Sequence, residues 1–233
     1  MSGTSQSDEA SVGARGRPSG FPAHRGFAAF WEWATKHESK AERKLRRAAV
    51  AKLSGRVLEL GVGVGANWPY LPADLEYVGI EPDPHMLRRA RKRAAAMGHR
   101  FTVEQARAEA LPFEDESFDT VLVTLTLCTV DDPQRALSEA QRVLKPGGSL
   151  IFAEHVRPEG RLAASVFDAI TPLWRRVGAG CHPNRRTEQA ISAAGLQIEA
   201  IERLRVNGLP MITGTARKHV GARQARGVND GID

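Results

Sequence analysis

The sequence predicts an α/β protein built on a doubly wound, mostly parallel sheet of about seven strands. Between residues 56 and 154, short apolar runs alternate with segments whose apolar residues recur at helical spacing. A glycine-rich turn at residues 61–65 follows directly on the first apolar run. Glu59 stands at the end of that run, and Glu81 ends the next. Such sheets bind ligands at the carboxyl ends of their strands, so these residues predict a cofactor site.

The composition is that of a single folded domain. The chain has 233 residues, of which 42% are hydrophobic, enough to bury one core. It has no apolar run long enough to span a bilayer, and residues 1–9 lack the basic-then-apolar pattern of a secretory signal. Its two cysteines, Cys128 and Cys181, are too few for a disulfide framework. We therefore expect a cytoplasmic protein in a reducing environment.

The charge of the chain is basic, with a net charge of +6 and a pI of about 9.7. This permits contact with an anionic surface, but the arginines and lysines are spread along predicted helices and both tails. No stretch combines basic residues with aromatic residues placed to stack on bases. We expect no nucleic-acid partner.

The N-terminal part divides into a polar tail and a helical region. Residues 1–25 are polar and rich in Gly and Pro, and we expect them to be disordered. Phe27, Phe30 and Trp31 share one helical face, and the pattern continues to Leu53. This region either packs on the domain or forms a lid over the crevice that also rests on anionic lipid. Its opposite face is predicted to be a solvated basic surface, made of Lys40, Arg43, Lys44, Arg46 and Arg47.

The middle of the chain predicts the alternating elements of the parallel sheet. Residues 84–97 form a basic amphipathic helix with Gly98 at its C-cap position. A second helix starts at Asp132, the expected N-cap, and runs through Val143. The strands expected around these helices comprise residues 101–104, 120–125 and 149–154, the last after a tight turn at 145–148.

The alternation breaks after residue 154. Residues 158–180 carry apolar positions at near-helical spacing, and residues 184–194 form a further helix. Residues 197–202 and 211–216 are expected to be the last two strands, a hairpin-like pair that closes the sheet edge. We therefore divide the chain into a disordered tail (1–25), one domain with its N-terminal lid helix (26–218) and a loose tail (219–233).

The glycine turn fits two classes of cofactor. Gly61, Gly63 and Ala66, with Glu81 about 20 residues later, satisfy a relaxed dinucleotide fingerprint, so an NAD-dependent oxidoreductase stays open. Glu59 would repel a pyrophosphate, whereas it suits a ligand that presents an ammonium group. A non-catalytic cofactor-binding protein of the same fold is a further alternative.

Five stretches in order resemble the class I S-adenosylmethionine-dependent methyltransferases, most closely the group with ubiquinone-biosynthesis and phospholipid methyltransferases. They are residues 59–65, 81–82, 108–113, 118–121 and 142–148. Residues 125–130 and 180–185 further resemble the thiol S-methyltransferase-like branch. The resemblance implies a Rossmann-like fold with an antiparallel last strand and S-adenosylmethionine as the cofactor. It also implies methyl transfer to a small, hydrophobic acceptor such as a thiol, a quinol precursor or a lipid amine.

The resemblance also implies roles for individual residues. Glu59 would balance the cofactor's ammonium, Glu81 would accept bonds from the ribose hydroxyls, and Thr124 would contact the amino-acid end. Where many relatives have Asp, this chain has Arg107, which offers no acceptor to adenine and is expected to stack on the ring or pair with Glu109. The cofactor-binding set implied is Glu59, Gly61, Gly63, Gly65, Glu81, Pro82, Met86, Arg107, Ala108 and Thr124.

In methyl transfer the protein mainly has to align the acceptor atom with the methyl carbon and the sulfur of the cofactor. The sulfonium already activates the methyl group. His155, after the strand that ends at Glu154, is the candidate base, with a strand-end histidine fixed by backbone bonds as the alternative. No residue set shows a convincing metal-ligand spacing, so no metal is expected. The acceptor atom and the oligomeric state stay open. The residues expected to line the acceptor pocket are Phe30, Trp31, Cys128, Trp174 and His182.

Overall fold

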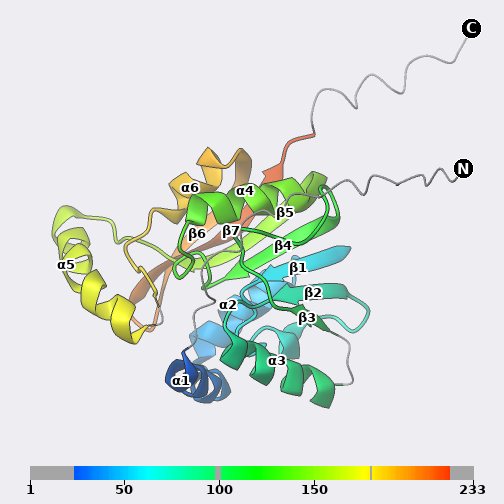
Figure 1. Ribbon diagram of the computed structural model, residues 1–233. Helices are drawn as coiled ribbons and strands as arrows, with labels where there is room; N and C mark the ends of the chain where they lie inside the picture. The colour runs from blue at the N-terminus through cyan, green and yellow to red at the C-terminus, as the bar shows by residue number, and fades with distance from the viewer. Residues whose placement is uncertain (1–23, 98–100, 179, 221–233) are drawn as a thin grey trace, which may run out of the picture.

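The computed structural model describes residues 24–97, 101–178 and 180–220. Most of the two predicted tails and the predicted C-cap at Gly98 lie outside these residues. Within them, a central sheet lies between two layers of helices (Figure 1).

The sheet has seven strands in the described part of the chain. They are β1 (Arg56–Leu60), β2 (Glu76–Ile80), β3 (Thr102–Glu104), β4 (Phe118–Thr124), β5 (Leu144–His155), β6 (Leu196–Val206) and β7 (Leu209–Lys218). Their order is β3-β2-β1-β4-β5-β7-β6, with β1 to β5 parallel. Strand β7 runs antiparallel between β5 and β6. The predicted doubly wound sheet with an antiparallel last strand is confirmed.

Helices cover both faces of this sheet (Figure 1). Helices α2 and α3 lie on one face, with α1 beside α3, while α4 and α6 lie on the other. Their bounds are α1 (Arg25–Lys36), α2 (Lys40–Val50), α3 (Pro84–Ala96), α4 (Pro133–Val143), α5 (Arg161–Val177) and α6 (Thr187–Ala193). A short 3-10 helix, η1 (Trp68–Tyr70), follows the glycine turn.

The core forms because side chains alternate between the two faces of each strand. Leu58 and Leu60 pack in the same cluster as Leu137 of α4, whereas Val57 packs with Ala90 of α3. Strands buried on both faces read as nearly continuous apolar runs, which is why these strands stand out in the sequence. The alternation leaves only the strand ends available for polar groups.

The N-terminal helical region is two helices rather than the single pattern predicted. Helix α1 ends at Lys36, and Ser39 caps the start of α2. The Ser39 hydroxyl accepts the Glu42 N–H at 3.1 Å, and the Glu42 carboxylate accepts the Ser39 N–H at 2.7 Å. This capping box ends one helix and begins the next, and its Ser-x-x-Glu pattern is a local signal of a helix start.

Four further elements, β5, β6, β7 and α6, have boundaries that differ from the prediction. Strand β5 already begins at Leu144, so the expected turn at 145–148 belongs to it, and the register shifts across this stretch. The last two strands are longer than predicted, and α6 begins at Thr187 rather than at residue 184. Elsewhere, Asp132 caps α4 as expected by accepting the Arg135 N–H at 3.0 Å.

Helix α5 occupies the expected interruption and projects from the sheet (Figure 1). Leu162, Val166 and Leu173 are exposed, so much of its apolar face has no cover within the described residues. None of the helices among these residues is both long and apolar enough to cross a membrane.

The sheet places a crevice at the carboxyl ends of β1 and β4. These strands are neighbours, and the chain continues from β1 to β2 on one side and from β4 to β5 on the other. The connections that follow β1 and β4 therefore lead away from each other at the boundary between these two strands. Doubly wound folds bind ligands at such a boundary.

Candidate active site

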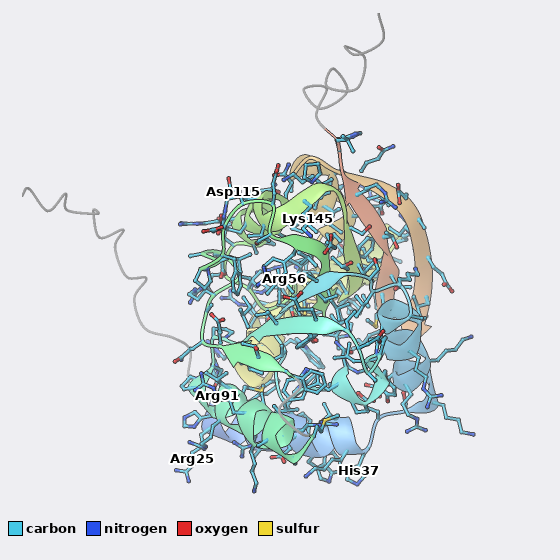
Figure 2. All side chains as sticks on the ribbon, turned by 90° about the vertical axis from the view of Figure 1, so that its right-hand side faces the viewer. Arg25, His37, Arg56, Arg91, Asp115 and Lys145 are labelled. Atoms are coloured by element: carbon cyan, nitrogen blue, oxygen red, sulfur yellow. The ribbon has the colours of Figure 1, made fainter. Side chains whose placement is uncertain are left out.

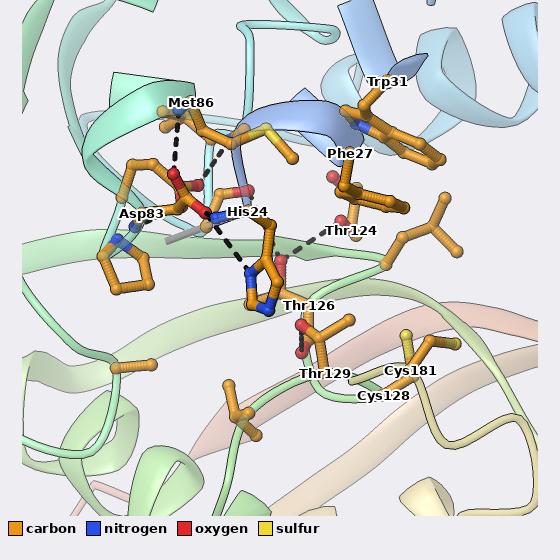
Figure 3. A pocket seen from close by; sticks show the side chains of 18 of the residues that line it. His24, Phe27, Trp31, Asp83, Met86, Thr124, Thr126, Cys128, Thr129 and Cys181 are labelled. Carbon is orange, nitrogen blue, oxygen red and sulfur yellow. Dashed lines mark hydrogen bonds and ion pairs between the residues drawn. The ribbon is translucent and has the colours of Figure 1, made fainter. Parts of the chain in front are cut away.

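A cavity of about 460 Å³ occupies this crevice. Its floor is made by residues at the ends of the strands, and Phe27, Phe30 and Trp31 of α1 line it from the other side. Figure 3 shows Phe27 and Trp31 at the cavity. The predicted site residues that line it are Glu59, Gly61, Gly63, Glu81, Pro82, Met86, Arg107, Ala108, Thr124, Phe30, Trp31, Cys128, Trp174 and His155. These residues, from elements far apart in the chain, share one cavity.

The glycine turn brings bare backbone to the cavity. Gly61 and Gly63 have φ values of +68° and +58°, in the left-handed region that favours glycine. A Cβ on Gly61 would collide with the Thr126 side chain at 2.6 Å. A Cβ on Gly63 would meet only Trp31, at 3.5 Å, and Met86, at 4.0 Å. Gly61 is thus required by packing, whereas Gly63 keeps space clear inside the cavity.

Glu81 is a buried carboxylate at the end of β2. Its oxygens accept the backbone N–H groups of Gly63, at 2.8 Å, and Asp83, at 2.9 Å. Burial raises the pKa of Glu81 to about 7, although these two bonds favour the charged form. Each oxygen has a further lone pair, so the group can still accept bonds from a ligand.

Glu59 is the other buried carboxylate of the floor. It accepts the Asn67 side-chain N–H at 2.8 Å and the Tyr77 hydroxyl. Burial raises the pKa of Glu59 to about 7, against the effect of these two bonds. Asn67 also donates to the Thr124 hydroxyl at 2.8 Å, so one amide orients two predicted site residues. Asn67 was not among the predicted site residues.

Arg46 corrects the prediction of a solvated basic face on α2. The residue is only 6% exposed and lines the cavity. Its guanidinium donates to the Glu38 carboxylate at 2.6 Å and to the side-chain amide oxygen (Oδ1) of Asn67 at 3.0 Å. Arg46 lies three and four residues before Ala49 and Val50, which are also buried, and this spacing is the signal that could have placed it inward.

Helix α1 is fastened over the cavity by polar and apolar contacts. The backbone N–H of His24 donates to the Asp83 carboxylate at 2.7 Å, and the His24 ring lies 3.4 Å from it (Figure 3). Glu32 accepts from Arg89 of α3 at 2.9 Å. Ala28 packs with Val64 and Met86 beneath the helix. Helix α1 therefore packs on the domain and lines the cavity, and its function as a lid stays a prediction.

Arg107 pairs with acids at the rim of the cavity. It contacts Glu109 at 3.4 Å and also Asp131, in agreement with one of its two predicted roles. Burial lowers the pKa of Arg107, but the hydrogen bond to Asp131 raises it. The net effect is an increase in the pKa of Arg107. The guanidinium is therefore held by carboxylates and not left free to recognise a ring.

Two predicted site residues do not line the cavity. Gly65 has a φ of +78°, and a Cβ there would lie 2.4 Å from the Trp68 ring, so packing of η1 requires this glycine. His182 donates its backbone N–H to the Cys128 carbonyl at 2.6 Å and holds the loop behind the cavity wall. Both residues support the site from outside.

Two cysteines and a histidine meet at the other end of the cavity. The ligand atoms of Cys128, His155 and Cys181 all lie within 4.8 Å of one another, and all three residues line the cavity. The hydrogen bond with Cys128 lowers the pKa of the Cys181 thiol to about 5, and it raises that of Cys128. Sequence spacing gave no sign of this cluster, because its members are separated by whole elements.

Glu154 anchors the Cys128 loop. Its carboxylate accepts the backbone N–H groups of Thr126 at 2.7 Å, Leu127 at 3.0 Å and Cys128 at 3.2 Å. Burial raises the pKa of Glu154 to about 7. The residue was predicted only as a strand end, and it fixes where the Cys128 side chain enters the cavity.

Comparison with known proteins connects this architecture to a family. Residues 58–152 match the family described as "Methyltransferase domain". The Rattus norvegicus protein "Thiol S-methyltransferase TMT1B" is 38% identical over 143 residues, which are 59% of this chain and 58% of that protein. A "Phosphatidylethanolamine N-methyltransferase" of Cereibacter sphaeroides is 38% identical over 129 residues, 54% of this chain and 64% of that protein. The chain thus spans less than two thirds of the length of these relatives.

A solved structure extends the likeness over the whole fold. A "possible histamine N-methyltransferase" from Thermotoga maritima has a TM-score of 0.62 and 26% identity, covering 83% of this chain and 96% of that one. Residues 58–152 form a methyltransferase domain of the class I S-adenosylmethionine-dependent type.

The residues of the cavity fit the methyltransferase cofactor. S-adenosylmethionine carries an ammonium group and ribose hydroxyls, and no phosphate. The cavity offers the buried carboxylates of Glu59 and Glu81, with that of Asp83 nearby, and a side-chain-free surface at Gly63. This donor set suits a cationic ligand, which also favours the ionised form of Glu59 and Glu81.

Proposed function

We propose that the protein transfers the methyl group of S-adenosylmethionine to the sulfur of a small, apolar thiol. The proposal goes beyond the family, because relatives of similar identity are named for thiol and for lipid amine acceptors. The observation that carries it is the meeting of residues 125–130 and 180–185, the two stretches that resemble the thiol branch.

These two stretches are joined at the end of the cavity away from Glu81. The Arg185 guanidinium donates to the Val130 carbonyl at 2.6 Å and also to the Leu127 carbonyl. Their cysteines and Trp174 line that end, and Phe30 and Trp31 line the cavity from α1. A pocket with apolar walls and few polar groups suits a small hydrophobic acceptor.

The residues would divide the work by position. When bound, the cofactor supplies an electrophilic methyl group. Glu81 and Glu59 would hold its ribose and ammonium ends, and α1 would exclude water from above. An acceptor thiol must lose its proton before it attacks, and His155 at the end of β5 is the residue that the sequence suggests as the base. The assignment of His155 as the base remains a proposal.

The test uses three acceptors that differ only in the reacting atom. The full chain is incubated with S-adenosylmethionine and an alkyl thiol, the matching alcohol or the matching primary amine, and methylated product is measured by mass spectrometry. We expect methylation of the thiol alone. Methylation of the amine and not of the thiol would overturn the proposal.

Contact of the α1 and α2 region with anionic lipid also stays a prediction, which vesicle co-sedimentation would test.

Calorimetry separates the remaining cofactor alternative. Titration with S-adenosylmethionine is expected to give saturable binding, and titration with NAD is expected to give none. Tight NAD binding without binding of S-adenosylmethionine would restore the oxidoreductase alternative. Binding of the methyl donor without turnover of any acceptor would instead favour a non-catalytic cofactor-binding protein.

A further inference from the structure

The cluster of Cys128, His155 and Cys181 has the composition of a metal site. The three side chains come from the loop after β4, the end of β5 and the loop after α5, and each supplies one ligand atom. Cys128 and Cys181 lie side by side at one end of the cavity (Figure 3). Both cysteines are free and buried.

The spacing of the ligand atoms suits zinc. They lie within 4.8 Å of one another. Zn–S bonds of about 2.3 Å and Zn–N bonds of about 2.0 Å place tetrahedral ligands roughly 3.5–3.8 Å apart. Rotamer adjustments that draw the atoms together by about 1 Å therefore complete the geometry.

The backbone around the cluster is already fixed. Glu154 accepts three backbone N–H groups of the Cys128 loop, and the Cys128 carbonyl accepts the His182 N–H at 2.6 Å. The Cys181 N–H donates to Gly178 at 3.0 Å. Hydrogen bonds that hold the residues next to a metal site orient the ligating side chains and strengthen metal binding.

His155, the histidine of the cluster, has one unsatisfied ring nitrogen. Its Nδ1 atom is shielded from solvent and has no hydrogen-bond partner in the described part of the chain. A buried ring nitrogen without a partner is costly, and a metal ion or a proton donor would satisfy it. Imidazole and thiolate are the ligands that zinc prefers.

We propose that Cys128, His155 and Cys181 bind one zinc ion whose fourth position opens into the cavity and takes the acceptor's thiol sulfur. Three protein ligands with one open position are typical of catalytic zinc, and two thiolates balance the charge of the ion. The metal site stands on the cluster alone. Its role in holding the acceptor rests on the proposed thiol methylation.

The chemistry balances without a further reactant. Binding of the acceptor sulfur to zinc releases the thiol proton to water and leaves a thiolate at neutral pH. A lone pair on that sulfur forms the new bond to the methyl carbon. The bond from this carbon to the sulfonium breaks, and its electron pair stays on the cofactor sulfur. Both products are neutral thioethers, which bind zinc more weakly than a thiolate does, so the product can leave. His155 then serves as a ligand, and no protein base is needed.

The first experiment measures metal in the full-length protein. The chain is purified under reducing, oxygen-free conditions, loaded with zinc, desalted and analysed by elemental mass spectrometry. We expect about one zinc per chain, falling to below about a tenth in Cys128→Ser and Cys181→Ser. His219→Ala, which removes an exposed histidine after β7 that does not line the cavity, is the matched control and is expected to keep the zinc.

A cobalt spectrum gives a readout independent of activity. Cobalt(II) in the same site is expected to show the intense visible bands of tetrahedral thiolate coordination. Adding the alkyl thiol without S-adenosylmethionine should shift these bands, and the matching alcohol should not. If the cysteine variants fail to fold, chelation of zinc from the wild-type protein and reconstitution with cobalt provide the same measurement.

The possible outcomes separate the two proposals. A wild-type protein that methylates the thiol at full rate with less than about a tenth of a metal ion per chain overturns the zinc site and leaves the proposed function standing. A Cys128–Cys181 disulfide in the active protein would likewise overturn the zinc site and leave the proposed thiol methylation standing. Zinc bound through the three residues without thiol methylation leaves the metal site standing and overturns the thiol assignment.

Discussion

At the scale of single residues, Glu81 is placed to decide cofactor affinity. Its carboxylate ends β2 and is held by two backbone N–H groups. In Glu81→Gln the amide keeps the shape but loses the charge and offers one oxygen. Hydrogen bonds to charged groups contribute about 1.5–3 kcal/mol, so we expect the dissociation constant of S-adenosylmethionine to rise roughly tenfold to a hundredfold. Calorimetry measures it directly.

A matched control for Glu81→Gln lies on the same strand. Glu76→Gln changes an exposed acid at the opposite end of β2 and is expected to leave affinity unchanged. Equal affinity of folded Glu81→Gln and the wild-type protein would show that the carboxylate does not bind the ribose.

Arg107 gives the contrasting case. Because its guanidinium is already paired with Glu109 and Asp131, it is not arranged to recognise adenine. We expect Arg107→Ala to change the affinity for S-adenosylmethionine by less than about tenfold, equivalent to roughly 1.4 kcal/mol. Equilibrium binding with a fluorescent or calorimetric readout checks this. A loss of several hundredfold would mean that the pair reorganises and that Arg107 does contact the cofactor.

At the scale of elements, α1 is the part of the fold that closes the cavity. It is held through Asp83 and Arg89, and Trp31 approaches the glycine turn. We expect deletion of residues 1–35 to abolish most turnover and to weaken binding of S-adenosylmethionine by about tenfold or more, because water then enters the site. Steady-state kinetics and calorimetry provide the two measurements.

Deletion of residues 1–22 serves as the control, since it leaves α1 intact. This shorter deletion is expected to change neither turnover nor affinity. If the protein without residues 1–35 folds and works at the full rate, α1 is a packing helix and not a lid.

At the scale of the whole molecule, the buried acids make folding stability depend on pH. The pKa values of Glu59, Glu81 and Glu154 are raised to about 7 by burial. Between about pH 4.5 and 7 the folded apoprotein therefore binds more protons than the unfolded chain. Its free energy of unfolding falls as the pH rises through this range, by on the order of 3 kcal/mol for each carboxyl at most.

Urea unfolding of the apoprotein at pH 5, 6, 7 and 8 measures this dependence. The decrease due to the carboxyls is expected between pH 5 and 7 and should end above about pH 7, whereas the Cys181 thiol, with its pKa lowered to about 5, contributes a smaller change in the opposite direction. Glu81→Gln removes one of the three carboxyls, so the free energy of unfolding of this variant should fall less steeply with pH. Glu59 and Glu81 also feel each other's charge, Asp83 lies beside Glu81, and His24 lies beside Asp83, so the separate effects need not add. A free energy that rises from pH 5 to 7 would contradict the assignment.

Local sequence determined most of the sheet and much of the cofactor site. The strands β1, β2 and β4 are buried on both faces. Such strands need nearly continuous apolar residues, and these runs can be recognised in the sequence. Gly61 and Gly63 have backbone conformations that other residues rarely adopt, and Glu59 and Glu81 lie at strand ends where a parallel sheet gathers ligands. Even the break between α1 and α2 has a local signal in Ser39 and Glu42.

Only the tertiary structure decided which distant groups meet. Arg46 looked solvated because its neighbours are basic, yet its guanidinium is buried where Asn67 and Glu38 offer acceptors. Cys128, His155 and Cys181 converge because β4 and β5 are adjacent strands and the loop after α5 folds back onto Cys128. Such contacts depend on strand order and loop closure rather than on residue spacing. A sequence pattern reports periodicity within one element, and it carries no distance between elements.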